Sequence, residues 1–147
     1  MKDILERFHK ALEKISWPEM PSQFQEFPLG TCGDISDILA EHLYEQGFGS
    51  IDYVCGIYNG RSHAWLEISG YAVDITANQF SDISANFLYQ PPEIWHYKFK
   101  EKTRRKAGYK TFHGPAIPDI EVLHDEIIAK LENVTIYEDT HKFNQQK

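Results

Sequence analysis

Three residues in the first half of the chain have the side chains that thiol catalysis needs: Cys32, His63 and Asp74. A cysteine attacks as its thiolate, an imidazole takes and returns the proton, and a carboxylate orients the imidazole. Cys32 stands at the predicted start of a helix, where free backbone N–H groups and the helix dipole favour the thiolate and supply a donor to an oxyanion. The three residues therefore predict a nucleophile, its base and the group that orients the base.

The helix that would carry Cys32 is expected to begin at Thr31 and to end near Gly47. Thr31 and Asp34 match a capping box, apolar residues at helical spacing follow, and Gly47 is a natural C-cap. Asp34 lies in the first turn, where its charge opposes a thiolate. Activation of Cys32 is therefore expected to need a nearby imidazole as well.

An antiparallel meander is predicted to carry the other two residues. Its strands are 51–58, 61–68 and 71–76, joined by two-residue turns at Asn59-Gly60 and Ser69-Gly70. This register makes His63 and Asp74 diagonal neighbours on one face, about 7–8 Å apart. The opposite face is a core face, to which Cys55 is assigned as a structural residue. A slip of one residue in either turn would place His63 and Asp74 on opposite faces.

The remaining elements complete an α+β pattern, with a Cys-bearing helix packed on an antiparallel sheet. A first helix starts near Asp3, which is expected to cap it, and ends before Pro18. The other expected elements are a loop over 18–30, a loosely helical stretch over 78–89, a strand over 94–99, a helix over 118–131 and a last strand over 134–137. One domain over residues 1–147 fits the length.

These motifs resemble a known superfamily. Gly30-Thr31-Cys32, the stretch Ser62 to Glu67 and the stretch Val73 to Thr76 are similar to the core of the transglutaminase-like (papain-like) cysteine enzymes, over about residues 27–80. The stretch Thr76 to Phe80 resembles small bacterial members. The resemblance implies Cys on a helix, with His and Asp on adjacent antiparallel strands. It also implies a peptidase, deamidase or transglutaminase-like acyltransferase that forms a thioester with a peptide or protein amide.

Further residues are expected around the three. Gln25, or else Gln23, would supply a second oxyanion donor from the loop before Cys32. Trp65, Glu67 and Gln79 would line the substrate cleft. The alternatives to these cleft roles are that Trp65 is a packing residue and that Glu67 is a solvated strand residue. His96, His113, His124 and His141 lack paired ligand spacing, so no metal and no cofactor are expected.

Composition narrows the classes of protein. The chain has 147 residues, two cysteines and a net charge of −7, from 15 Lys+Arg and 22 Asp+Glu. Two cysteines exclude a disulfide framework, and the charge argues against a protein that coats nucleic acid. No apolar run reaches the 18 residues of a membrane span, and the N-terminus has no apolar signal core. The expected location is the cytoplasm.

Two alternatives to catalysis stay open. The same fold could be a binding module in which the three residues do not assemble. The basic segment 98–110 could instead bind an acidic partner or nucleic acid, since it holds seven Lys/Arg and one Glu, a local charge of +6. The overall negative charge disfavours nucleic acid and favours a solvated basic surface or an acidic protein.

Overall fold

The computed structural model describes residues 1–112 and 118–145, with the side chains of 1–110 and 118–134. The helices are α1 (Lys2–Glu13), α2 (Cys32–Glu45), α3 (Tyr109–Phe112) and α4 (Pro118–Gln145). The strands are β1 (Asp52–Tyr58), β2 (Arg61–Ile68), β3 (Tyr71–Asp74), β4 (Leu88–Gln90) and β5 (Lys100–Lys106). Short 3-10 turns are η1 (Trp17–Glu19), η2 (Ser22–Phe24), η3 (Ala77–Gln79) and η4 (His96–Lys98).

The strands that the structure describes form one antiparallel sheet with the order β4-β3-β2-β1-β5. The predicted register of β1 and β2 is confirmed: Gly56 pairs with His63 and Cys55 with Ala64. The turn residues Asn59 and Gly60 both have positive φ, as a two-residue hairpin turn requires. The turn between β2 and β3 has the same conformation, so both turns hold the register that the sequence predicts.

The two faces of the sheet bury different kinds of side chains. Leu66, Ile68 and Val73 face the main apolar core, which also contains residues of α1, α2 and α4. The alternate residues Val54, Trp65 and Ala72 belong to a second cluster, which Leu88, Trp95 and Phe99 complete. The predicted core face is therefore confirmed, and the opposite face has an aromatic cover of its own.

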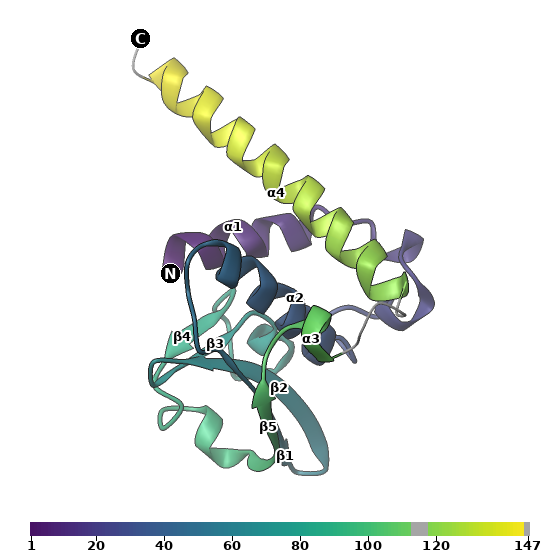
Figure 1. Ribbon diagram of the computed structural model, residues 1–147, viewed down its shortest axis with the longest axis vertical. Helices are drawn as coiled ribbons and strands as arrows, with labels where there is room; N and C mark the ends of the chain where they lie inside the picture. The colour runs from purple at the N-terminus through teal and green to yellow at the C-terminus, as the bar shows by residue number, and fades with distance from the viewer. Residues whose placement is uncertain (113–117, 146–147) are drawn as a thin grey trace.

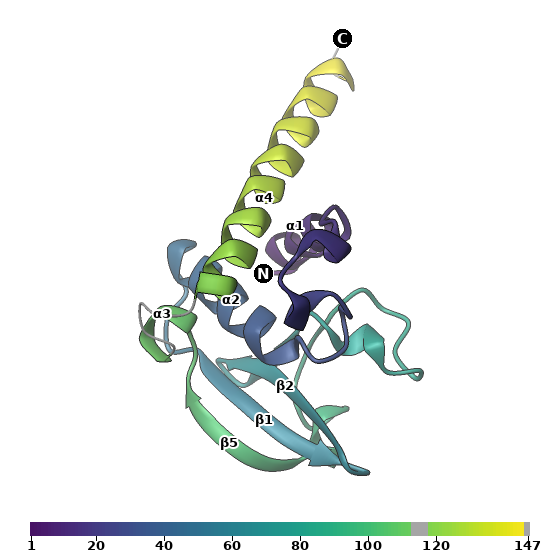
Figure 2. The same cartoon turned by 90° about the vertical axis from the view of Figure 1, so that its right-hand side faces the viewer.

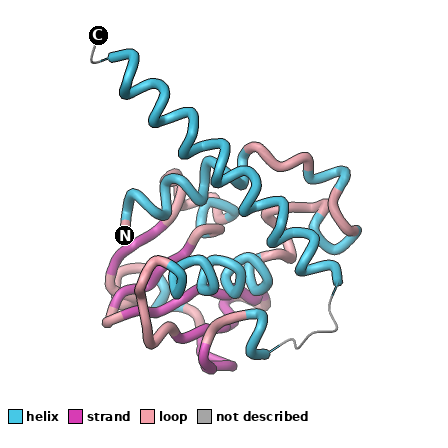
Figure 3. The backbone as a smooth tube through the Cα atoms, turned by 45° about the horizontal axis from the view of Figure 1, so that its top comes forward, coloured by secondary structure: helices cyan, strands magenta, loops and turns pink. Residues whose placement is uncertain are grey.

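Helix α2 lies on the sheet, and α1 and α4 lie beyond it (Figures 1 and 2). Figure 3 separates the helical layer from the strands by colour, and α4 extends past the rest of the fold. A buried ion pair joins α2 to the edge of the sheet, because the Arg105 guanidinium of β5 donates to both carboxylate oxygens of Asp37 at 3.1 and 2.8 Å. Asp37 also accepts from Gly108 N at 2.9 Å. No helix among the described residues is long and apolar enough to cross a membrane.

Several predicted elements are wrong. Residues 78–89 are not a helix, since only the end of η3 and the start of β4 fall there and β4 takes its hydrogen bonds from β3. Residues 94–99 are not a strand: Trp95 and His96 are both buried, Ile94 and Tyr97 are both exposed, and a strand would alternate. Residues 134–137 continue α4, because Val134 is buried at helical spacing from Leu131 and Ile127.

The two predicted helix caps also differ from expectation. Helix α1 begins at Lys2 with Met1 at the N-cap, so Asp3 lies inside the first turn instead of capping it. Thr31 does occupy the N-cap of α2, but its hydroxyl donates to Pro28 O at 3.0 Å and caps no backbone N–H. The N-terminus of α2, where Cys32 stands, is therefore not closed by the side chain of its own cap residue.

Candidate active site

Asp74, the last residue of β3, is the centre of the candidate site. Its Oδ2 accepts from His63 Nε2 at 2.6 Å and from His96 Nε2 at 2.7 Å, and its Oδ1 accepts from Thr76 N at 3.2 Å. The side chain is 1% exposed. Burial alone would raise the pKa of Asp74, but the charges and hydrogen bonds of the two histidines lower it to about 2. The carboxylate is thus ionised, and each Nε2 that faces it carries a proton.

His63 lies on β2 and is fully buried. The rings of Phe80 and Phe99 stand 4.9 and 5.6 Å from its ring, and Trp65 lies beside it. Burial would lower the pKa of His63, but Asp74 and then Cys32 raise it, to about 9. A neutral His63 with its proton on Nε2 has a free lone pair on Nδ1, and this is the form that can act as a base.

Cys32 is the first residue of α2 and is half-buried. It is one of the groups that raise the pKa of His63, which places its thiol next to that imidazole. Because Nε2 of His63 faces Asp74, Nδ1 is the ring nitrogen left to exchange a proton with Cys32. The three residues that the sequence singles out are thus brought together in the order sulfur, imidazole, carboxylate.

Gln79, at the end of η3, also contacts Nδ1 of His63. Its Nε2 lies 3.3 Å from His63 Nδ1 and donates to Thr76 O at 3.0 Å, while its Oε1 accepts from the Arg61 guanidinium at 3.0 Å. The sequence places Gln79 in a substrate cleft, and the structure places it against the base itself.

The other predicted cleft residues lie on the His96 side of Asp74. Trp65 and Glu67 line a cavity of about 340 Å³ with His96 and Arg104. Trp65 is 3% exposed and donates through Nε1 to Glu67 at 3.0 Å. It is therefore a packing residue as well as part of the cavity wall. Glu67 also pairs with Arg104 at 3.0 Å, which means that it is not a solvated strand residue.

The predicted oxyanion residues have other hydrogen-bond partners. Gln25 Nε2 donates to Met20 O at 2.9 Å, within its own loop, and Gln23 Nε2 donates to Asp119 at 3.0 Å. Their predicted role at the Cys32 sulfur stays a prediction. Cys55 is a free thiol on the core side of β1, and burial raises its pKa, as does the nearby Cys32.

His96 is the residue that sequence reasoning missed. It lies in η4, 22 positions from Asp74, and is 1% exposed. The stretch 91–99 has neither helical nor strand periodicity, and its histidine has no paired ligand spacing with another histidine. No signal in the sequence pairs His96 with a carboxylate on another strand.

The same three side chains could hold a metal ion. His63 Nε2, Asp74 Oδ2 and His96 Nε2 lie within 4.8 Å of one another, and two imidazoles with a carboxylate suit Zn²⁺. Their 2.6 and 2.7 Å separations are those of hydrogen bonds, whereas tetrahedral zinc ligands stand about 3.3 Å apart. A metal would have to displace both Nε2 protons and spread the ligands. The expectation of no metal and no cofactor stays a prediction, and His113 and the side chain of His141 lie outside the described residues.

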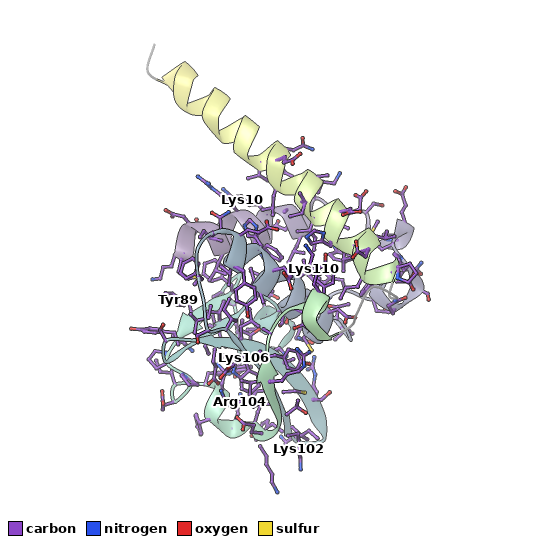
Figure 4. The ribbon with its side chains drawn as sticks, in the orientation of Figure 1. Lys10, Tyr89, Lys102, Arg104, Lys106 and Lys110 are labelled. Carbon is purple, nitrogen blue, oxygen red and sulfur yellow. The ribbon has the colours of Figure 1, made fainter. Side chains whose placement is uncertain are left out.

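The basic segment 98–110 is mostly the edge strand β5, along which Lys102, Arg104 and Lys106 project (Figure 4). Carboxylates from outside the segment pair with its cations, namely Asp37, Asp52, Glu67 and Asp82. These four reduce its local charge from +6 to +2. The binding of an acidic partner or nucleic acid stays a prediction, with less charge to support it.

No family model, curated protein or solved structure matches this chain. The chemistry of the site is therefore inferred from its residues and their geometry.

Proposed function

We propose that this protein is a cysteine-dependent amide hydrolase or acyltransferase whose catalytic residues are Cys32, His63 and Asp74. One observation carries the proposal: His63 gives Nε2 to a buried, ionised carboxylate, and the thiol that raises its pKa stands at a helix start. A nucleophile, its base and the group that orients the base need this arrangement. The α+β fold, with the cysteine on a helix and the other two residues on adjacent strands, also supports a transglutaminase-like core.

Because the pKa of His63 is raised to about 9, Nδ1 already holds the thiol proton of Cys32 near neutral pH, and the reaction begins from the thiolate. The thiolate forms an S–C bond with the amide carbon, and the π electrons of the carbonyl move to its oxygen. The tetrahedral intermediate then collapses: the C–N bond breaks, and the Nδ1 proton of His63 goes to the departing nitrogen. An amine or ammonia leaves, and Cys32 holds the acyl group as a thioester.

The second half transfers the acyl group to an acceptor. His63 takes a proton from the acceptor, which attacks the thioester carbon, and the S–C bond breaks to restore Cys32 with the proton from His63. Water as acceptor gives a peptidase or deamidase, and an amine gives a transglutaminase-like acyltransferase. Asp74 keeps Nε2 of His63 protonated throughout, so that Nδ1 is always the nitrogen that exchanges the proton.

The test is the rate at which iodoacetamide alkylates Cys32 and Cys55 across pH 4 to 10, resolved by peptide mass spectrometry. Cys55 is an internal control, because burial raises its pKa. Cys32 is expected to react well below pH 8.5, the reference pKa of a free thiol. His63→Ala should remove this low-pH reactivity, with thermal unfolding measured alongside because His63 is buried. A Cys32 that titrates like a free thiol in the wild type contradicts the proposal.

A further inference from the structure

The side-chain amide of Gln79 is held in one orientation. Its carbonyl oxygen accepts from Arg61, so its nitrogen is the end that faces Thr76 O and His63 Nδ1. One N–H of that nitrogen donates to Thr76 O at 3.0 Å. The other N–H is directed at His63 Nδ1, 3.3 Å away.

The partner of this second N–H changes with the proton on His63. In the neutral ring Nδ1 has a lone pair and accepts from Gln79. Once Nδ1 has taken the proton of Cys32, it is itself a donor and can accept nothing. With its pKa raised to about 9, His63 carries that proton near neutral pH, so the Gln79 N–H has no acceptor on Nδ1 when negative charge lies next to it, first on sulfur and then on the attacked carbonyl oxygen.

We propose that Gln79 is a catalytic residue whose Nε2–H donates to the oxyanion of the tetrahedral intermediate, together with the backbone N–H of Cys32. This inference rests on the proposed thiol chemistry and assigns to Gln79 the role that the sequence suggested for Gln25. The S–C bond forms, the carbonyl π pair becomes the oxyanion, and the two N–H groups stabilise that charge until the C–N bond breaks. A donor that is held in place and has no competing acceptor on His63 stabilises the charged transition state.

Arg61 acts on the reaction through Gln79 and is a positioning residue. Its guanidinium lies 4.2 Å from the centroid of the Phe80 ring while it donates to Gln79 Oε1. Without that donor the amide can rotate and present its oxygen to the oxyanion. Arg61→Met is therefore expected to reduce the same step as loss of Gln79, by a smaller factor.

Two reactions of the Cys32 sulfur distinguish an oxyanion donor from a residue that only supports the fold. Alkylation of Cys32 by iodoacetamide is a displacement that forms no oxyanion, whereas acylation by p-nitrophenyl acetate passes through one. Gln79→Met keeps the length of the side chain and removes the N–H. We expect it to slow acylation about a hundredfold and to leave alkylation within severalfold of the wild type.

Gln46→Met is the matched control, because Gln46 is an exposed residue at the C-cap of α2, at the opposite end of that helix from Cys32. It should change neither reaction. Equal losses of acylation and alkylation in Gln79→Met, or no loss of acylation, overturn the inference, and so does an equal selective loss of acylation in Gln46→Met. A wild type whose Cys32 is alkylated at low pH but is not acylated overturns the proposed function, which distinguishes the two failures.

Discussion

Asp37 and Asp74 are both carboxylates that the fold buries almost completely, at 0% and 1% exposure. Each accepts three N–H donors. Asp37 takes two from the Arg105 guanidinium and one from Gly108 N, and Asp74 takes two from imidazoles and one from Thr76 N. Both are well-compensated buried anions, and in electrostatic terms they differ mainly in the kind of donor.

That difference separates a structural ion pair from a candidate active site. A guanidinium is always charged and cannot give up its proton near neutral pH, so the Asp37–Arg105 pair can only hold α2 to β5. An imidazole gains and loses a proton near neutral pH, so the hydrogen bonds of Asp74 can couple to chemistry. A buried carboxylate is thus not a sign of function by itself, and the titration of its partner decides what it can do.

The sharpest test of the comparison replaces each aspartate with asparagine. An asparagine at position 74 presents an N–H to His63 Nε2 and so favours the tautomer with the proton on Nδ1, where no base faces Cys32. We expect Asp74→Asn to slow acylation of Cys32 by about 10³-fold or more. The measurement is p-nitrophenol release at pH 7. Asp82→Asn is the matched control, since Asp82 is 55% exposed and its hydrogen-bond partners, Trp95 and Lys98, are not residues of the proposed triad.

The pH dependence of folding stability should also differ between the wild type and Asp74→Asn. The pKa of His63 is raised in the folded protein to about 9. Its contribution to the free energy of unfolding is therefore full below about pH 6.5 and is lost as the pH rises through 9, a loss of about 3 kcal/mol. Asp74→Asn removes the carboxylate that raises the pKa of His63, so this loss should disappear and stability should be nearly flat above about pH 7. Urea unfolding at pH 6 to 10 measures both slopes, and parallel slopes would contradict the assignment.

Asp37→Asn should have its effect on stability alone. It removes the charge from a pair in which Arg105 is 24% exposed and Asp37 1% exposed. The free energy of unfolding should fall by about 2 kcal/mol, the scale of hydrogen bonds to a charged group. The alkylation profile of Cys32 in the folded variant should match that of the wild type. A variant that keeps its stability but loses Cys32 reactivity would reverse the roles given to the two aspartates.

The parts of this comparison that the sequence predicts are local. Asn59-Gly60 fixes the β1–β2 register and Ser69-Gly70 the β2–β3 register, and together they place His63 and Asp74 on one face. The start of α2 is equally local, since Thr31 and the apolar stripe after it mark where Cys32 must stand. Short-range turn and helix signals are therefore sufficient for the pairing of His63 with Asp74.

Asp37 and Asp74 each have a hydrogen-bond donor that is distant in the sequence. Arg105 is 68 residues from Asp37, and His96 is 22 from Asp74 and lies in a stretch without periodicity. Such pairs depend on how irregular segments close over the sheet, which periodicity and turn chemistry do not determine. The carboxylates that pair with the basic segment are also distant in sequence, since they come from α2, β1, β2 and the loop after η3.

The smallest expected effect concerns His96, which contributes a donor to Asp74 as Gly108 N does to Asp37. His96→Gln keeps an N–H at the position of Nε2, whereas His96→Met of similar size does not. Loss of a hydrogen bond to the anion raises the pKa of Asp74, and stability from a lowered carboxyl pKa is lost as the pH falls through that value. Acid unfolding of His96→Met should therefore begin about one pH unit higher than in the wild type.

Tryptophan fluorescence reports this transition at the site, since the Trp65 ring lies 4.7 Å from the His96 ring. His96→Gln should unfold at nearly the pH of the wild type, because Asp74 then keeps three donors, as Asp37 does. If the glutamine and methionine variants shift together, His96 only fills space and the two carboxylates are less alike than their donors suggest. A shift in the methionine variant alone shows that the second imidazole keeps Asp74 ionised for His63.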